Sequence, residues 1–377
     1  MPASTRAAEV GLKLQRLRAH VAARGARGAV LTKVANVAWL SAGARTFINV
    51  AAEAGAAWVV VTPDRTAVLT NNIEAARLRE EELAGLDWEV LACDWWEERG
   101  LERLLADVAG PAQGLLADGG VPGTTDGAAE FAELRSALGA AEQARAAALG
   151  RDCGAALEAC CRALVPGDTE FAVAGRLAAA CYDRGVEPVV HLVAADARAW
   201  TRRHPLPTGA AVASYALVAL CGMRDGLVMS CTRLVHFGRP PDDLLRRWRA
   251  AASVDAEMIA ATRPGATAGD VFAAAEAAYR QTGFDGEWRH HHQGGLAGYA
   301  SREWRAVPGG PQRVLPGQMF AWNPSVAGAK SEDTVLAAEA PGGAAAPRVL
   351  TETGGWPLAT IGTRVGVAVR RPEILVR

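Results

Sequence analysis

The chain has 377 residues with a formal net charge of −1; half of the residues are apolar and 21% are charged. This length predicts two globular domains, because one ordinary hydrophobic core does not grow so large. The balanced charge gives no electrostatic reason to expect nucleic acid or a membrane surface as partner, and no apolar run is long enough to span a bilayer.

The cysteines and the N-terminus indicate the cellular compartment. The seven cysteines are scattered without a Cys-x-x-Cys pair, and several of them fall in helical patterns as small apolar residues. The first residues lead into an amphipathic helix and not into an apolar signal segment. We therefore expect a cytoplasmic protein without disulfides or a cysteine zinc site.

The first third of the chain alternates between strand and helix patterns. Apolar spacing predicts a helix over residues 9–24. Further helices are expected over 73–83 and 97–108, and strands over 28–31, 57–62, 66–69, 88–92 and 114–117. This alternation predicts a small α/β domain, residues 1–135, followed by a second domain, residues 136–377, which opens with an Ala-rich helix over 141–164.

The second domain contains an internal echo. Residues 166–169 and 264–267 both read Pro-Gly-x-Thr, and each is followed by an Ala-rich amphipathic segment that ends at a glycine. Each cassette predicts a turn, a threonine helix cap and a helix. We interpret the pair as a pseudo-twofold repeat; the alternative is a chance similarity of two capping signals.

Two apolar strands, 215–222 and 226–234, lie between the cassettes and are joined at Asp225-Gly226, a strong hairpin signal. Strand alternation predicts that Leu220, Ser230 and Thr232 share one face, and that Cys231 lies on the other, in the core.

Residues 287–332 combine a histidine run with two strand patterns. His290-His291-His292 precedes paired glycines, and the later strands carry Asn323 and Glu332. Clustered imidazoles beside close-packed backbone predict the wall of an active site, whereas a solvated loop with an accidental histidine run is the alternative.

Together these motifs resemble the creatinase, prolidase and methionine aminopeptidase superfamily, whose fold is called pita-bread. Residues 36–43 resemble its Asn-Ile-x-Tyr-Leu-x-Gly segment, Thr232-Arg233 its Asp-x-Thr-Arg strand, and residues 332–335 its Glu-Asp-Thr-Val strand. The resemblance covers nearly the whole chain. It implies an α/β (α+β) fold with a small N-terminal creatinase-like domain, a C-terminal pita-bread domain with pseudo-twofold helix–strand repeats, and a homodimer.

Most members of that superfamily hold two metal ions with two Asp, one His and two Glu. The resemblance places these five ligands on Leu220, Ser230, His292, Asn323 and Glu332. Because one histidine and one carboxylate do not make a tight site, we expect no catalytic metal and no cofactor, and at most a stray ion on His290 and His292.

Creatinase resembles this chain in having the fold without the metal, and it hydrolyses a C–N bond with a histidine that corresponds to His204. The resemblance implies that His204 is the general acid and base, and that His292 and Glu332 position substrate and water. The carboxylate that creatinase has on its hairpin strand falls on Thr232, which cannot hold a guanidinium by charge. Creatine itself is therefore not the expected substrate.

Seven residues are expected to contact substrate: Arg45, Phe47, Thr232, Tyr299, Arg302, Trp322 and Asn323. Arg302 is suited to clamp a carboxylate. Tyr299 stands where many relatives keep a second histidine, and core packing is the alternative for Trp322. By analogy with relatives, Arg45 reaches the pocket of a second subunit.

We expect a metal-independent, creatinase-like enzyme that hydrolyses a C–N bond of a small amino-acid-like, amidine or amide molecule. The same residues also suit a metal-free lyase, isomerase or cyclase of specialised metabolism. A non-catalytic binding protein and an Xaa-Pro metallopeptidase are the remaining alternatives.

Overall fold

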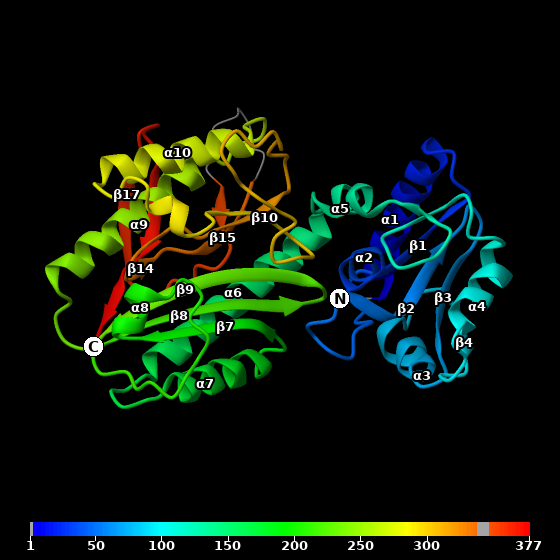
Figure 1. Cartoon of the computed structure of the whole chain (residues 1–377), viewed down its shortest axis with the longest axis horizontal. Coiled ribbons are helices and arrows are strands. Elements are labelled where there is room, and N and C mark those ends of the chain that lie inside the picture. Colours follow the sequence, from blue (N-terminus) through cyan, green and yellow to red (C-terminus); the bar gives the residue numbers. More distant parts are fainter. Residues whose placement is uncertain (1–2, 338–346) are drawn as a thin grey trace. The chain divides into compact units, whose positions relative to one another are not determined.

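The computed structural model describes residues 3–337 and 347–377. The chain divides into two compact units, Met1–Ser136 and Ala137–Arg377, and each has its own layers of helix and sheet (Figure 1). Among the described residues, no helix combines the length and the apolar character needed to cross a lipid bilayer.

The first unit is a mixed sheet with strand order β4-β3-β2-β1-β5-β6. The strands are β1 (Gly28–Lys33), β2 (Ala54–Val61), β3 (Thr66–Asn71), β4 (Glu89–Cys93), β5 (Leu115–Ala117) and β6 (Thr125–Asp126). The helices are α1 (Ala3–Ala23), α2 (Val34–Leu40), α3 (Ala75–Arg77), α4 (Gly100–Ala109) and α5 (Ala128–Arg135). The helix expected over 73–83 is the short α3 continued by one π-helical turn, η1 (Leu78–Glu82).

The second unit contains two successive arrangements of two helices followed by three main strands. The first arrangement has α6 (Ala140–Arg162), α7 (Glu170–Tyr182), β7 (Glu187–Ala195), β8 (Tyr215–Arg224) and β9 (Leu227–His236), with the short α8 (Ala197–Thr201). The second has α9 (Asp242–Ala261), α10 (Ala268–Gln281), β10 (Gly294–Ala297), β12 (Met319–Trp322) and β15 (Asp333–Leu336). The minor elements are η2 (Glu287–His290), β11 (Trp304–Arg305), β13 (Ser325–Val326), β14 (Ala329–Lys330), β16 (Arg348–Val349), β17 (Leu358–Gly362), β18 (Ala368–Pro372) and β19 (Ile374–Val376).

The predicted pseudo-twofold repeat is confirmed by matching details of the two cassettes. Thr169 caps α7 by accepting a hydrogen bond from the Ala172 amide, and Thr267 caps α10 in the same way. Each threonine also forms an isolated β-bridge to a residue further along its own half. Helix α9, the first helix of the second arrangement, was not anticipated, although the buried Leu244, Trp248 and Met258 lie at helical spacing on one face.

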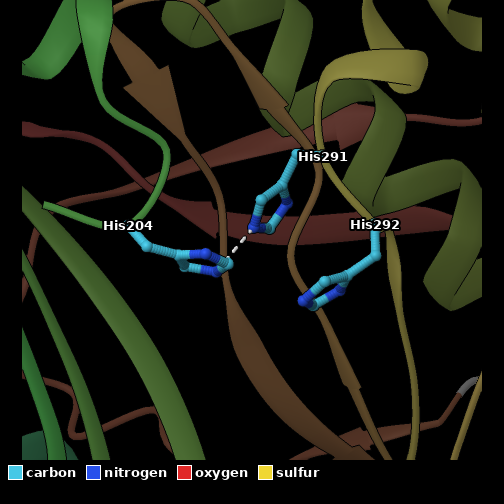
Figure 2. A group of neighbouring side chains, drawn as sticks. All are labelled: His204, His291 and His292. Carbon is cyan, nitrogen blue, oxygen red and sulfur yellow. Dashed lines mark hydrogen bonds between the residues drawn. The ribbon is translucent and has the colours of Figure 1, made fainter.

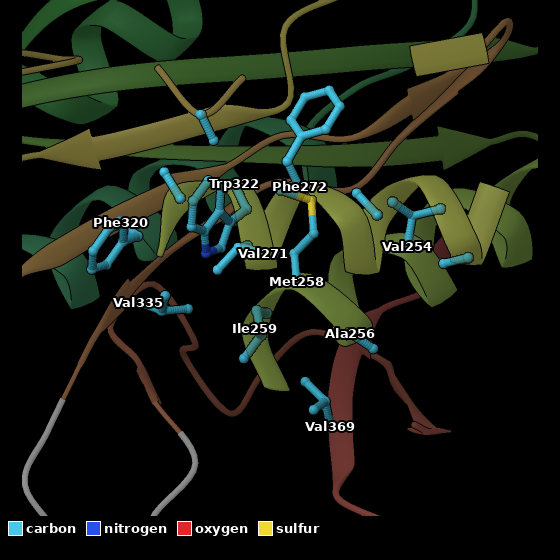
Figure 3. Close-up of a cluster of buried hydrophobic side chains, with 14 of the residues drawn as sticks. Val254, Ala256, Met258, Ile259, Val271, Phe272, Phe320, Trp322, Val335 and Val369 are labelled. Atoms are coloured by element: carbon cyan, nitrogen blue, oxygen red, sulfur yellow. The ribbon is translucent and has the colours of Figure 1, made fainter. Parts of the chain in front are cut away.

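A large hydrophobic core lies where α9 and α10 pack against the strands of the second half (Figure 3). Trp322 belongs to this core: it is fully buried, and its Nε1 donates a hydrogen bond to Thr262 Oγ1 at 2.9 Å. It stacks on Phe320, with 5.3 Å between ring centroids. The expectation that Trp322 lines the substrate pocket therefore gives way to the alternative, core packing.

The hairpin predicted at Asp225-Gly226 is present, and its turn sets the register of β8 and β9. Both residues have positive φ, +53° and +78°, as a two-residue type I′ turn requires. The strands pair directly on either side, Arg224 with Leu227.

This register corrects one prediction. Leu220 pairs with Cys231, whereas Ala219 pairs with Thr232. Because cross-strand partners point to the same face, Leu220 does not share the face of Ser230 and Thr232. The reason is the two-residue loop, which pairs odd positions on β8 with even positions on β9. Cys231 is fully buried, as expected.

Candidate active site

The second unit contains a pocket of about 280 Å³ between β7, β8 and the loops before β10, β11 and β15. Its lining residues are Val190, Leu192, His204, Ala219, Leu220, Cys221, His292, Ser301, Arg302, Arg305, Asn323, Lys330 and Glu332. Five residues singled out from the sequence are thus brought together from distant segments: His204, His292, Arg302, Asn323 and Glu332.

Glu332 is the only carboxylate among these lining residues, and protein groups already bind it. The side chain is 4% exposed. Thr232 Oγ1 donates to Glu332 Oε2 at 2.6 Å, and the Lys330 ammonium lies 2.8 Å from the same oxygen. Arg302 Nη2 lies 3.5 Å from Oε1.

These contacts set the ionisation of Glu332. Burial raises the pKa of its carboxyl, but the charges of Lys330 and Arg302, with the hydrogen bonds from Lys330 and Thr232, outweigh burial and hold the pKa below its usual value. Glu332 is therefore an ion-paired carboxylate at neutral pH. Lys330 was not singled out from the sequence, although its place two residues before Glu332 in an extended segment was an available signal.

Two polar groups at the pocket have unused hydrogen-bonding capacity. Asn323 is 3% exposed, and its Oδ1 has no hydrogen-bond partner among the described residues. The Nε of Arg302 is also buried without a hydrogen-bond partner among the described residues. The contact from Arg302 Nη1 to Ser230 Oγ is long, at 3.4 Å. A bound molecule would satisfy groups whose burial without partners is costly.

Three imidazoles form a second group at the pocket, and Figure 2 shows their rings turned toward one another. His204, in the loop after α8, and His291, directly after η2, have their Nε2 atoms 3.1 Å apart. The rings of His291 and His292 are stacked with 4.4 Å between centroids. One nitrogen of the His204–His291 pair must carry the shared proton.

All three imidazoles are unprotonated at neutral pH. Burial, followed by the charge of Lys330, lowers the pKa of His204. Burial lowers the pKa of His291 to about 2 and that of His292 to about 4, with further contributions from nearby cations and the neighbouring rings. The lining residues thus carry three fixed cations, Arg302, Arg305 and Lys330, against one carboxylate. The pocket is suited to an anionic ligand.

The histidine loop is held in place by the buried Gln293. The Tyr279 hydroxyl donates to Gln293 Oε1 at 2.8 Å, and Gln293 Nε2 donates back to the His291 carbonyl. Gly294 follows with φ +102°, where a Cβ would lie 2.1 Å from the Ala321 carbonyl oxygen. Only glycine allows β10 to approach β12 in this way.

Three residues expected at the site lie elsewhere or in the other unit. Tyr299 is buried and donates to Glu142 Oε1 at 2.6 Å, and it is not among the pocket-lining residues. Arg45 and Phe47 belong to the first unit, where Arg45 Nη2 lies 2.9 Å from Glu82 Oε1. A role for Arg45 in the pocket of a second subunit stays a prediction.

Comparison with known proteins identifies the family. Residues 144–339, more than half of the chain, match the metallopeptidase family M24, and residues 13–149 match the creatinase/prolidase N-terminal domain. The chain belongs to metallopeptidase family M24.

Solved structures share the fold over nearly the whole chain. The dipeptidase PepE from Mycobacterium ulcerans is 20% identical, with a TM-score of 0.76 and 98% of each chain covered. The prolidase from Pyrococcus horikoshii is 15% identical, with a TM-score of 0.76 over 90% of this chain and 98% of the other. The N-terminal domain of the FACT complex subunit SPT16 from chickpea also matches, with 12% identity, a TM-score of 0.67 and coverage of 94% and 96%.

One curated protein is more similar in sequence. An agropine synthesis cyclase of Rhizobium rhizogenes is 28% identical over 205 residues, which cover 48% of this chain and 52% of that protein. The chain thus spans about half the length of this relative.

The residues present do not fit the two-ion centre of the superfamily. The resemblance sets Leu220 and Ser230 against the two Asp ligands of that centre and Asn323 against one Glu, and all three side chains are neutral. Glu332, which remains, is bound to Lys330. Three neutral groups and an ion-paired carboxylate do not provide the anionic ligands that hold two divalent ions together.

Proposed function

We propose that this chain is a metal-independent enzyme that breaks a C–N bond of a small, amino-acid-like carboxylate. One observation carries the proposal: Glu332 is held by Lys330 and Arg302 in the pocket that also contains the unprotonated His204. Fixed cations of the protein thus neutralise the one carboxylate among the pocket-lining residues.

The pocket is complementary to a carboxylate with a neighbouring hydrogen-bond donor. Arg302 Nε has no hydrogen-bond partner among the described residues; Nη1 donates to the Ser301 carbonyl at 2.5 Å, and the contacts of Nη1 to Ser230 and of Nη2 to Glu332 are long. With Arg305, which also lines the pocket, it can bind the two oxygens of a carboxylate. Asn323 Oδ1 can accept a hydrogen bond from an N–H or O–H of the same molecule.

His204 supplies proton transfer in this proposal. The neutral imidazole takes a proton from a water molecule as the water oxygen attacks the carbon of the scissile C–N bond. The imidazolium then gives that proton to the leaving nitrogen as the C–N bond breaks. Such a general base and acid contributes about 10²- to 10⁴-fold to a rate. Lys330 lies where it can stabilise negative charge that develops on the substrate.

Intramolecular cyclisation is the second candidate, and the similarity to a protein named agropine synthesis cyclase favours it. The same histidine would then deprotonate a hydroxyl or amine of the substrate itself in place of water. That group attacks an amide carbon of the same molecule, so that a ring bond forms, the amide C–N bond breaks, and the amine leaves with the proton from His204.

A two-stage experiment tests the proposal. Melting shifts with a panel of N-substituted amino acids, amides and hydroxy acids first identify a ligand, since a ligand at 100 times its Kd stabilises by about 2.7 kcal/mol. Turnover is then followed by mass spectrometry in H₂¹⁸O with excess chelator. Incorporation of ¹⁸O indicates hydrolysis, and a ring product without it indicates cyclisation. Activity that chelator removes and manganese restores would contradict metal independence.

A further inference from the structure

The proposed reaction needs only one of the three clustered histidines. His204 can exchange protons alone, yet the nearly buried His291 and the partly buried His292 converge on it (Figure 2). One ring nitrogen from each of the three residues lies within 4.8 Å of the other two. In the described part of the chain, the Nδ1 atoms of His291 and His292 are buried without a hydrogen-bond partner.

The spacing is close to that of ligands on one ion. Two imidazole nitrogens bound to a tetrahedral zinc ion, each at about 2.0–2.1 Å, lie about 3.3 Å apart. The Nε2 atoms of His204 and His291 are already 3.1 Å apart. His204 is exposed and belongs to a loop, so its ring can rotate to adjust its distances to the other two imidazoles.

Two of the ligands are also preorganised. Gln293 is fully buried, accepts a hydrogen bond from Tyr279 and donates to the His291 carbonyl, so the backbone that carries both rings is fixed. A site whose ligands are held by such contacts loses little entropy when an ion binds.

From this arrangement we propose that His204, His291 and His292 form a mononuclear site for a borderline transition ion, Zn²⁺, Co²⁺, Ni²⁺ or Cu²⁺. Imidazole suits these ions, whereas Mg²⁺, Ca²⁺ and Mn²⁺ prefer oxygen ligands. This site differs from the superfamily's two-ion centre, because it needs neither Asn323 nor Glu332 and includes two histidines outside that ligand set.

The surroundings of the site predict that a bound ion exchanges readily. The site has no anionic ligand, and the cationic Lys330 and Arg302 lie in the same pocket. The Nδ1 atoms of His291 and His292 also lack the hydrogen-bond acceptors that usually strengthen metal binding by histidine. We expect micromolar affinity and an anion or water in the remaining coordination position. A bound ion occupies the lone pair of His204, so the ion inhibits the enzyme. This inhibition rests on the proposed function, whereas the binding of the ion does not rest on it.

Calorimetric titration of the full chain with ZnCl₂, after chelator treatment, tests the site, and the visible spectrum with CoCl₂ reports its geometry. The wild type should bind one equivalent of Zn²⁺. His291→Ala and His204→Ala should each weaken binding by more than about 100-fold, because loss of an outer contact alone costs about 10- to 100-fold. His290→Ala is the matched control: it removes the exposed neighbouring imidazole and should change Kd by less than about twofold.

Absence of binding, or binding that depends on His290 in place of His291, overturns the site. His204 is exposed in its loop, so its variant keeps the test valid if His291→Ala fails to fold. Zinc inhibition in the concentration range of binding, reversed by chelator, supports both proposals. Binding without inhibition leaves the site standing and removes His204 from the reaction.

Discussion

The ion pair between Lys330 and Glu332 is the contact that most directly separates this pocket from a two-ion centre, and its strength can be measured. The two side chains are 7% and 5% exposed, and their charged atoms are 2.8 Å apart. Lys330→Met leaves Glu332 with the more distant Arg302, and Glu332→Gln leaves a buried ammonium. Breaking a buried pair from one side costs about 3–5 kcal/mol.

The double variant should behave differently from the sum of its parts. With both charges removed, the desolvation cost of Lys330 and Glu332 disappears too, and such replacements are often close to neutral. We therefore expect a coupling of several kcal/mol in the double-mutant cycle. For a unit of this size, each single variant should lower the melting temperature of the second unit by about 6–20 °C.

Urea and thermal unfolding of the four proteins, monitored on the second unit's transition, provide the measurement. The matched control is the more exposed pair of Arg370 and Glu352, whose side chains are 63% and 21% exposed and whose atoms lie 2.6 Å apart. Its removal should cost no more than about 1 kcal/mol. Because the charged atoms of the two pairs lie at similar distances, a difference in their coupling energies reports the effect of burial.

The coupling should also depend on pH. The folded-state pKa of Glu332 lies below its usual value. Its stabilisation is therefore fully present above the unfolded-state pKa of about 4.3 and is lost as pH falls through the lowered folded-state pKa. Single variants that each cost less than about 1 kcal/mol and add within about 0.5 kcal/mol at pH 7 would refute the reasoning. Glu332 would then be free to bind a cation.

Three further variants test the site and its support. His204→Ala should lower turnover by about 10²- to 10⁴-fold while ligand affinity by melting shift stays within a few-fold, and unchanged turnover would exclude it as the general base. Tyr279→Phe should destabilise by about 1–3 kcal/mol in urea unfolding, because it strands the buried Gln293 Oε1; a neutral effect would show that the histidine loop does not need this anchor. Trp322→Ala should cost about 3–5 kcal/mol as a core deletion, and a loss of ligand binding with unchanged stability would instead place it at the pocket.

Local chemistry in the sequence was sufficient for much of the fold. The two Pro-Gly-x-Thr cassettes, the Asp225-Gly226 hairpin and the buried Cys231 all follow from short-range rules of capping, turn geometry and alternation. The missed helix α9 was within reach of the same rules, because Leu244, Trp248 and Met258 on its buried face lie at helical spacing.

The site could be predicted only in part. His204, His292 and Glu332 were found because their motifs resemble those of a superfamily. Lys330 was not singled out, although it lies two residues before Glu332. His291 was named only as part of the histidine run, because its contact with His204 joins loops 87 residues apart. Leu220 was misplaced by one residue, which in a strand moves a side chain to the opposite face.

The amino-acid sequence by itself determined the family and most of the order of the elements, because these depend on residue identity and short-range geometry. Only the tertiary structure decided which charges and rings meet. The approach of Thr232 and Arg302 to Glu332 and the convergence of His204 on His291 depend on how separate chain segments pack, and no local pattern specifies such distances.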